Sequence, residues 1–459
     1  MTTPRPLPAW AEELRRRYLR GESSIFVLHG NVYDAVLHDG KLRPLPEFLA
    51  EVLLKDTKDT VALFNLATGV RFTKRGGGAG AVEDYLLSQG REKVFQALER
   101  LLTKTSKVAV IVEYAETLAP AGDPSFLGDL DRASIVTLHR WSFLPEIEED
   151  DNVVLLIAEN LSELSPKLVS NPKVAVVDVP MPDRETRRAT ALAADPKLTE
   201  KDAERYAEVT AGLKAIQIAS ILAPPPPAEE DRAEREAFIS GLLGAAPDAA
   251  DRAKKLATLT AGLSREEIRK LIAPQAAEAG APAEPPAERA KKEADRLIAK
   301  RKREILEREC FGLVEFVEPA HGFDVVGGMD EVKKDLALLA ENIREGRTAR
   351  VPMGVLFTGP MGTGKTFVAE AFAKECGLTT IKLKNFRSKW VGATEGNLER
   401  ILTVVKAIGQ VVVIIDEGDR AFGNQEGEGD GGTSSRVIAR IKEFMSDTSN
   451  RGRILFLVM

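Results

Sequence analysis

Short apolar runs separated by longer amphipathic segments fill the chain up to about Pro180. The runs are rich in β-branched residues, and they begin at Ile25, Val61, Val108, Val153 and Val174. Runs of this length, divided by segments long enough for a helix, predict parallel strands of an α/β sheet. The same alternation resumes from Phe323 onward, so the pattern predicts a second α/β region in the same chain.

The middle of the chain has a different pattern. Over residues 183–272 the apolar spacing is helical, and two similar helix junctions are broken by Gly212 and Gly262. Pro/Ala-rich stretches start at Ala223 and Ala273, and such compositions predict linkers or surface insertions. Residues 284–309 predict an exposed connecting helix, whose basic run at 300–303 is typical of a solvated face.

Composition limits the classes of function. The two cysteines, Cys310 and Cys376, form no CxxC pair, and the four histidines are scattered, which argues against a zinc site and fits a reducing compartment. The net charge of -6, from 70 acidic and 64 basic residues, disfavours a broad surface for nucleic acid. No apolar run approaches the ~20 residues that cross a bilayer, so we expect a cytoplasmic protein without membrane contact.

The motif with the clearest chemistry is GVLFTGPMGTGKT, which begins at Gly354. An apolar strand precedes a glycine-rich loop, and the helical pattern FVAEAFAKE follows it. Phosphate binding needs converging backbone N–H groups without Cβ atoms in the way, and glycines allow that bend. The following helix directs its N-terminus at the anion. The alternative is a glycine-rich turn that only joins a strand to a helix.

Each position of this loop has a predicted contact with ATP and Mg²⁺. Lys365 supplies a charge for the β- and γ-phosphates and takes part in catalysis, and the hydroxyl of Thr366 is a magnesium ligand. The residues predicted to bind the nucleotide are Gly359, Pro360, Met361, Gly362, Thr363, Gly364, Lys365 and Thr366, which we call the P-loop.

An acidic pair ends a later apolar strand, VVVIIDEGD, which begins at Val411. We predict that this strand lies beside the P-loop strand, which places Asp416 in the magnesium shell. Glu417 is then the catalytic base near the water that attacks the γ-phosphate. An acidic pair at a strand end is common, and it gains this meaning from the P-loop upstream.

From Phe323 to Met459 the chain resembles the AAA+ ATPases, in the branch that includes katanin, spastin, the proteasomal ATPases and the FtsH protease. FDVVGGMDEVKKDL is similar to the first segment of that domain, which implies that Val326 and Gly327 line the adenine pocket. GPMGTGKT resembles the Walker A motif with Met361 in place of a second proline, and IIDEGD matches the Walker B motif.

The resemblance extends to a loop that lines the central pore of the ring in this family. KWVGATEGNLERIL is similar to that loop and its following helix, which implies that Trp390 and Val391 grip an extended polypeptide. The alternative is that Trp390 is a half-buried core aromatic. The resemblance also implies self-association into a ring of six subunits and a protein substrate.

The first half resembles the same fold without its phosphate site. IFVL leads into HGNVYDAVL, where Gly30 keeps the turn but no Gly-Lys-Thr follows. The strand VAVIV ends in Glu113 and Tyr114, and Asn160 stands at the position of a sensor residue. This tandem layout, with a degenerate first module, is similar to that of uncharacterised cyanobacterial and plastid AAA proteins.

We therefore predict an α/β fold with two modules of the P-loop NTPase type. We expect a degenerate AAA+-like module at 1–182 and a helical lid with a Pro-rich insertion at 183–272. A linker with a charged helix is expected at 273–322, and an incomplete AAA+ core at 323–459. The sequence stops at RILFLVM, within the expected sensor-1 strand. We expect either a piece of a longer ATPase or a turnover that is very slow or absent.

Three functions fit this prediction. The first is an ATPase that remodels or unfolds a protein substrate. The second is a scaffold or regulator that binds ATP with little or no hydrolysis. The third, a nucleic-acid motor that uses the basic connector, is the weakest.

Overall fold

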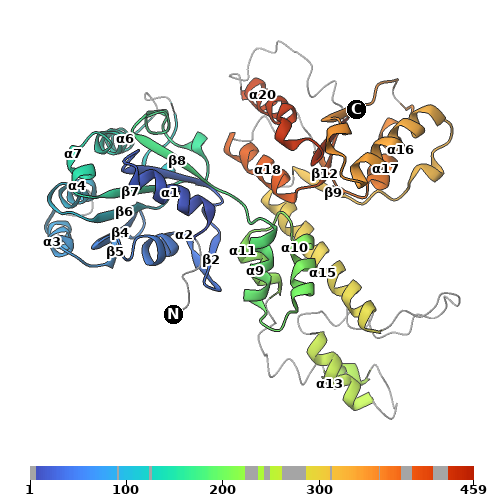
Figure 1. The fold of residues 1–459 in the computed structure, drawn as a ribbon, viewed down its shortest axis with the longest axis horizontal. Coiled ribbons are helices and arrows are strands. Elements are labelled where there is room, and N and C mark those ends of the chain that lie inside the picture. Colours follow the sequence, from blue (N-terminus) through green and yellow to red (C-terminus); the bar gives the residue numbers. More distant parts are fainter. Residues whose placement is uncertain are drawn as a thin grey trace.

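The computed structural model describes residues 7–89, 93–122, 127–222, 236–241, 249–260, 286–310, 313–360, 362–383, 395–416 and 433–459. One six-stranded and one five-stranded sheet occupy the first and second halves of the chain. Helices of the middle region lie between the two sheets, at the centre of Figure 1.

The first sheet has the strand order β5-β4-β6-β7-β1-β8. Its strands are β1 (Ile25–Gly30), β4 (Thr60–Asn65), β5 (Gly69–Lys74), β6 (Val108–Val112), β7 (Val153–Ile157) and β8 (Val174–Val179). The five predicted strands are parallel to one another, as expected. β5 was not predicted; it forms an antiparallel edge beside β4.

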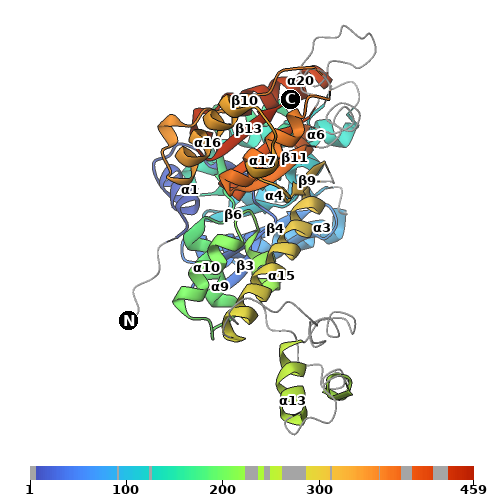
Figure 2. The ribbon, with the colours of Figure 1, turned by 90° about the vertical axis from the view of Figure 1, so that its right-hand side faces the viewer.

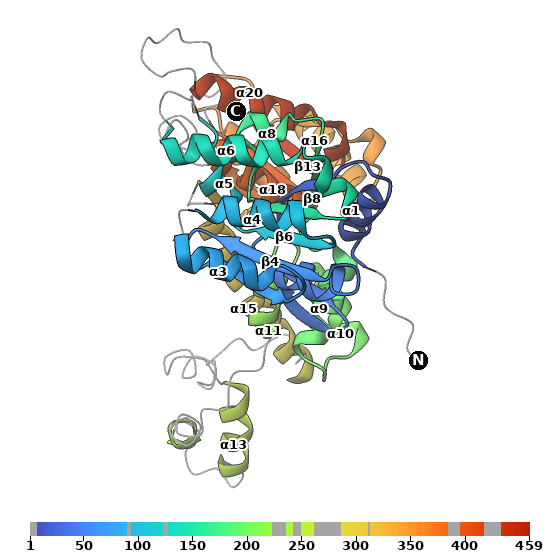
Figure 3. The same cartoon turned by 90° about the vertical axis from the view of Figure 1, so that its left-hand side faces the viewer.

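Helices cover both faces of the first sheet because alternate strand residues point to opposite sides. Val110 and Val112 of β6 share one apolar cluster with Leu98, whereas Ala109 and Ile111 share another with Phe48. The first cluster lies under α3 (Ala79–Gln89), α4 (Val94–Lys104) and α6 (Asp129–Trp141), which face the viewer in Figure 3. The opposite face carries α1 (Ala9–Leu19), α2 (Leu45–Phe48) and the π-helix Leu49–Leu53.

Shorter elements complete this half. The antiparallel hairpin of β2 (Ala35–His38) and β3 (Lys41–Pro44) follows β1. Single-turn elements connect the strands: α5 (Ala115–Leu118), α7 (Pro145–Glu149), the 3₁₀ turn Leu161–Glu163 and α8 (Pro166–Val169).

The predicted helical region contains α9 (Arg184–Ala194), α10 (Glu200–Val209), α11 (Ala215–Leu222) and α13 (Ala249–Leu259). We call α9, α10 and α11 the lid helices. Asp183 and Thr199 cap α9 and α10 through their side-chain oxygens. Gly212 turns the chain between α10 and α11 with φ +88°. The second predicted junction, at Gly262, lies outside the described residues.

The connecting helix α15 (Pro286–Glu309) is less exposed than predicted. Ile298 and Leu306 are buried, and Leu306 shares an apolar cluster with Leu213 before α11 and Ile401 of the second half. The helix therefore lies against both the lid helices and the second half. The prediction of an exposed helix was wrong because these partners lie far away in the sequence.

The basic run of α15 is only partly solvated. Lys300 and Arg301 are exposed, as expected. Arg303 forms an ion pair with Glu318. Burial lowers the pKa of Lys302 to about 8, with a further contribution from the positive charge of Arg187.

The second sheet has the strand order β10-β13-β12-β11-β9. Its strands are β9 (Val314–Val317), β10 (Gly354–Leu356), β11 (Thr379–Leu383), β12 (Val411–Ile415) and β13 (Ile454–Val458). β9 is antiparallel to β11, and the other pairs are parallel.

Helices also cover both faces of the second sheet, which is at the front of Figure 2. One face carries α16 (Asp330–Arg344) and α17 (Lys365–Cys376), and the other carries α18 (Glu395–Ile408) and α20 (Thr433–Ser446). The 3₁₀ turns Phe323–Val325, Thr348–Arg350 and Thr448–Asn450 join these elements.

The prediction that the two motif strands lie side by side was wrong. β12, which ends before Asp416, does not lie beside the P-loop strand β10, because β13 lies between them. Phe456 of β13 is in register with Gly354 on one side and with Val413 on the other. Because adjacent strands are ~4.8 Å apart, β10 and β12 are separated by about 10 Å.

Candidate functional site

The P-loop lies between the end of β10 and the start of α17. Gly364 stands at the N-terminus of α17 with φ +83°, and Gly362 has φ +79°. A Cβ added at either glycine would meet no atom within 4 Å. Both glycines are therefore needed for backbone conformation, and the space above the loop is open. Met361 lies outside the described residues.

Lys365 bends back over the loop. Its Nζ donates hydrogen bonds to the carbonyl oxygens of Gly359, at 2.7 Å, and Pro360, at 2.8 Å. The hydroxyl of Thr363 also donates to the Pro360 carbonyl, at 2.9 Å. The ammonium group thus lies at the mouth of the loop, against these two carbonyls. Thr366 follows in the first turn and is partly exposed.

Asp416 follows β12 and is held by a lysine of the neighbouring strand. The Nζ of Lys382 donates to Oδ2 of Asp416 at 2.8 Å, and the Asp416 side chain is 36% exposed. Lys382 was not predicted as a site residue, although it is the one charged residue in the strand TTIKL of β11. Glu417 lies outside the described residues.

The segment before α16 is attached to the P-loop helix. The ring of His321 stacks on Phe367 with centroids 3.8 Å apart, and Lys374 donates to the carbonyl of Ala320 at 3.0 Å. Val326 is buried in the cluster that contains residues of α17, and Gly327 is exposed. Of the two residues predicted to line the adenine pocket, Val326 therefore packs with the helix that begins at the P-loop, and Gly327 follows it at the surface. His321 was not predicted as a site residue.

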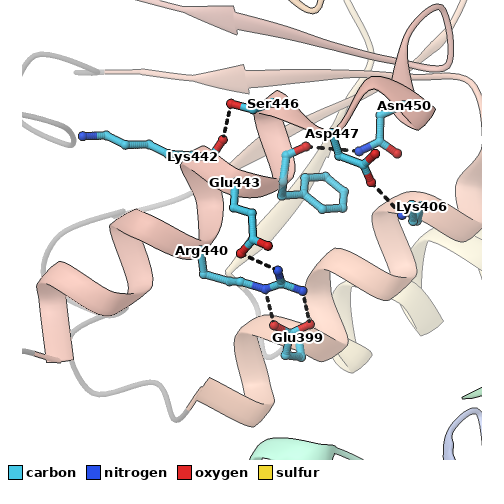
Figure 4. A network of polar contacts seen from close by, with 9 residues as sticks. Glu399, Lys406, Arg440, Lys442, Glu443, Ser446, Asp447 and Asn450 are labelled. Carbon is cyan, nitrogen blue, oxygen red and sulfur yellow. Dashed lines mark hydrogen bonds and ion pairs between the residues drawn. The ribbon is translucent and has the colours of Figure 1, made fainter. Parts of the chain in front are cut away.

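The helix that follows the predicted pore loop is tied to α20. The guanidinium of Arg440 on α20 binds both carboxylate oxygens of Glu399 on α18 and also binds Glu443 (Figure 4). These hydrogen bonds raise the pKa of Arg440 above its usual value. Lys406 pairs with Asp447 further along the two helices. The predicted substrate-gripping residues Trp390 and Val391 lie outside the described residues.

The corresponding positions of the first sheet hold other side chains. Glu113 after β6 accepts a hydrogen bond from Asn65 at 2.9 Å. Tyr114 adopts a left-handed conformation with φ +57° and stacks on Tyr33, 5.2 Å between centroids. Asn160, at the predicted sensor position, donates to Glu163. Each of these three residues thus contacts a neighbouring side chain of the first half.

A cavity of about 590 Å³ lies between the two halves, away from the P-loop. His29 and Asp178 line it from the first sheet, and Glu399, Lys406 and Arg440 line it from the second half. Burial lowers the pKa of His29, although the negative charges of Asp178 and Glu399 act in the opposite direction.

Two protein-family models match the chain. Residues 2–180 match the N-terminal Rossmann-like domain of AAA+ chaperones, and residues 355–459 match the AAA family of ATPases associated with various cellular activities. The chain thus carries an N-terminal domain of the AAA+ chaperone type and an AAA domain. This result confirms the predicted family and, with the two parallel-rich sheets, the predicted fold class.

Curated relatives resemble parts of this AAA+ protein. The ATP-dependent zinc metalloprotease FtsH 3 of Symbiobacterium thermophilum is 38% identical over 117 residues, which are 24% of this chain and 18% of the relative. The uncharacterised AAA domain-containing protein ycf46 of Trieres chinensis is 38% identical over 109 residues, 23% of this chain and 21% of the relative. The chloroplastic FTSH 2 of Oryza sativa subsp. japonica is 37% identical over 140 residues, 28% of this chain and 21% of the relative. This chain thus spans about a fifth of each relative.

Proposed function

We propose that this AAA+ protein binds ATP with Mg²⁺ at the P-loop and hydrolyses it. The observation that carries the proposal is the loop between β10 and α17, with open space above its glycines and the Lys365 ammonium at its mouth. Helix N-termini and converging backbone amides attract phosphate, and a lysine adds charge for the β- and γ-phosphates. The donors of the loop therefore fit a triphosphate.

The predicted residues have the following roles in the proposal. The backbone of residues 359–366 holds the phosphates, and Val326 with Gly327 receives the adenine. Thr366 and Asp416 hold Mg²⁺, which neutralises charge on the phosphate oxygens. Glu417 orients the attacking water and accepts its proton.

Binding is tested with Lys365→Ala. We expect the affinity for MgATP to fall at least tenfold, because charge-assisted hydrogen bonds to the phosphates are lost, by ~1.4 kcal/mol or more. Isothermal titration calorimetry measures this loss, and Lys201→Ala, an exposed lysine on α10, is the matched control. Unchanged affinity in Lys365→Ala would refute the site.

Hydrolysis is tested separately with Glu417→Gln. We expect phosphate release to fall by about 10²-fold or more while MgATP binding persists, because general-base assistance contributes roughly that factor. If wild-type protein releases no phosphate and the variant behaves in the same way, the hydrolysis part of the proposal fails.

One observation favours the second candidate, an ATP-binding scaffold with little hydrolysis. The Lys382 ammonium donates to Oδ2 of Asp416, so it competes with Mg²⁺ for that carboxylate. Under this candidate, ATP changes the affinity for a partner, and Glu417→Gln changes neither binding nor the partner affinity.

The finer parts of the proposal concern assembly and substrate. AAA+ proteins typically form hexameric rings, and we propose a ring of six that pulls a polypeptide past Trp390 and Val391, with domains at 1–182, 183–272, 273–322 and 323–459. Sedimentation with and without MgATP tests the ring. Stimulation of phosphate release by DNA or RNA would favour the nucleic-acid motor instead.

We propose a cytoplasmic location. Among the helices that the structure describes, none combines the length and the apolar character needed to span a bilayer. Fractionation of cells that express the full chain tests this proposal, and recovery of the protein with membranes or plastids would contradict it.

A further inference from the structure

The side chain of Asp34 binds the N-terminus of a lid helix that is far away in the sequence. Asp34 lies in the loop after β1, and its Oδ2 accepts a hydrogen bond from the amide of Ala215 at 2.8 Å. Its Oδ1 accepts from the amide of Ile216 at 3.0 Å. The residue is only 6% exposed. A single carboxylate thus satisfies two of the free N–H groups that open α11.

The loop around Asp34 is arranged for this contact. Asn31 donates to Oδ2 at 2.8 Å, and the amide of Ala35 donates to Oδ1 at 2.7 Å. Four donors therefore converge on one carboxylate, two from its own loop and two from α11. Hydrogen bonds of this charge-assisted type are stronger than neutral ones, especially when buried.

This loop occupies the same place in the first sheet as the P-loop does in the second. β1 lies next to β7, and β10 lies next to β13. The next strand across each sheet, β6 or β12, is followed directly by an acidic residue, Glu113 or Asp416. After β10 the loop provides backbone amides and Lys365, which suit an external anion. After β1 the loop provides the anion itself, because Asp34 meets the amides of a helix.

We infer that the Asp34 carboxylate is a built-in anion that holds the lid helices on the first sheet without any nucleotide. A helix N-terminus favours negative charge, and here the favoured charge is covalently part of the chain. The contact uses only groups of the chain itself. The first half is consequently a permanent support, whereas the site of the second half depends on a ligand.

The same helix also holds the second half. Gln217 of α11 donates to Glu309 at the end of α15, at 2.6 Å. Ile218 is fully buried in the cluster that includes Ile401 of α18. Asp34 is therefore a positioning residue, because it fixes α11 and through α11 fixes the contact with α18.

Hydrogen exchange of the full chain tests the inference without reference to ATP turnover. In Asp34→Ala we expect exchange at the amides of Ala215 and Ile216 to accelerate at least tenfold, because their acceptor is lost. We expect a smaller acceleration in α18. The matched control is Asp183→Ala, which removes a carboxylate cap of α9 that accepts from the nearby Thr186 amide. It should leave α11 and α18 unchanged.

Added formate distinguishes an anion site from general loss of packing. Formate should slow exchange at Ala215 and Ile216 in Asp34→Ala, with no such effect in wild type or Asp183→Ala. The inference is overturned if Asp34→Ala exchanges like wild type or if formate acts equally on all three proteins. If Asp34→Ala does not fold, Asp34→Asn is measured instead, because asparagine keeps the shape of the side chain without its charge. Exchange in α11 at the wild-type rate in Asp34→Asn would overturn the role of the charge.

Discussion

β1 and β10 hold the same place in their sheets but differ in their surroundings. β1 pairs with β7 and β8, and four of its residues are buried. Within the described residues β10 pairs with β13 alone, and its Leu356 is 67% exposed. The loop after β1 is bound by β7, β8 and α11, whereas the P-loop after β10 is closed by its own Lys365.

The difference shows how one fold position serves two purposes. Buried polar groups need partners, so a loop whose partners are supplied by the chain becomes structural. A loop whose amides and lysine remain near solvent can exchange its partners for a ligand. Substitutions that act on one loop and spare the other therefore sharpen the comparison.

The largest effect is expected for Gly30→Ala. Gly30 has φ +93°, and an added Cβ would lie 2.7 Å from Oδ1 of Asp178 and 2.8 Å from the carbonyl oxygen of Val179. Backbone strain and overpacking together should lower the free energy of unfolding by about 2–4 kcal/mol. Chemical denaturation measures this change. Gly364→Ala is the matched variant, because a Cβ added there meets no atom, and it should lower the free energy of unfolding by only ~1–2 kcal/mol. Equal losses of stability in the two variants would contradict the comparison.

Gly212→Ala should have the next largest effect. Gly212 has φ +88°, and its Cβ would lie 3.0 Å from Cγ1 of Ile408, at the end of α18. We expect a loss of about 1–3 kcal/mol and faster proteolysis between the halves, because the lid helices and α18 must move apart. Gly241→Ala, where a Cβ meets nothing, should be close to wild type in both measurements.

Lys382→Met should change the affinity for Mg²⁺ rather than the stability of the fold. The Lys382–Asp416 pair is partly exposed, so its loss should cost less than ~1 kcal/mol of stability. Without the lysine, Asp416 loses a positive charge that competes with a cation, and we expect up to about fivefold tighter Mg²⁺ binding in the presence of ATP. Titration of MgCl₂ against a fluorescent ATP analogue measures this effect, with the exposed Lys334→Met as control. Weaker binding would mean that Lys382 positions Asp416.

His29→Gln should have the smallest effect, and only under acid conditions. Because burial lowers the pKa of His29 below 6.5, the unfolded chain takes up a proton first. The free energy of unfolding therefore falls as the pH drops below the unfolded value. We expect His29→Gln to lose less stability than wild type between about pH 7 and pH 5.5. Identical pH profiles in denaturant titrations would contradict this.

The sequence predicted what is determined locally. Five of the six strands of the first sheet and the P-loop turn follow from apolar runs and glycine spacing, which depend on neighbouring residues. The order of the strands does not follow from such patterns, so the position of β13 between β10 and β12 was not predicted. Lys382 was overlooked because its partner Asp416 follows a different strand. The contact of Asp34 with α11 joins residues 181 positions apart, which no local pattern reveals.

The apolar cluster shared by α11, α15 and α18 has a practical consequence for anyone who divides this protein. A recombinant piece that begins after α15 lacks Leu213, Ile218 and Leu306, which cover α18 in the full chain. Ile401 and neighbouring side chains would then form a contiguous hydrophobic patch exposed to water, and such patches promote aggregation. A soluble second half needs the lid helices and α15 to be kept, or the exposed side of α18 to be replaced by polar residues.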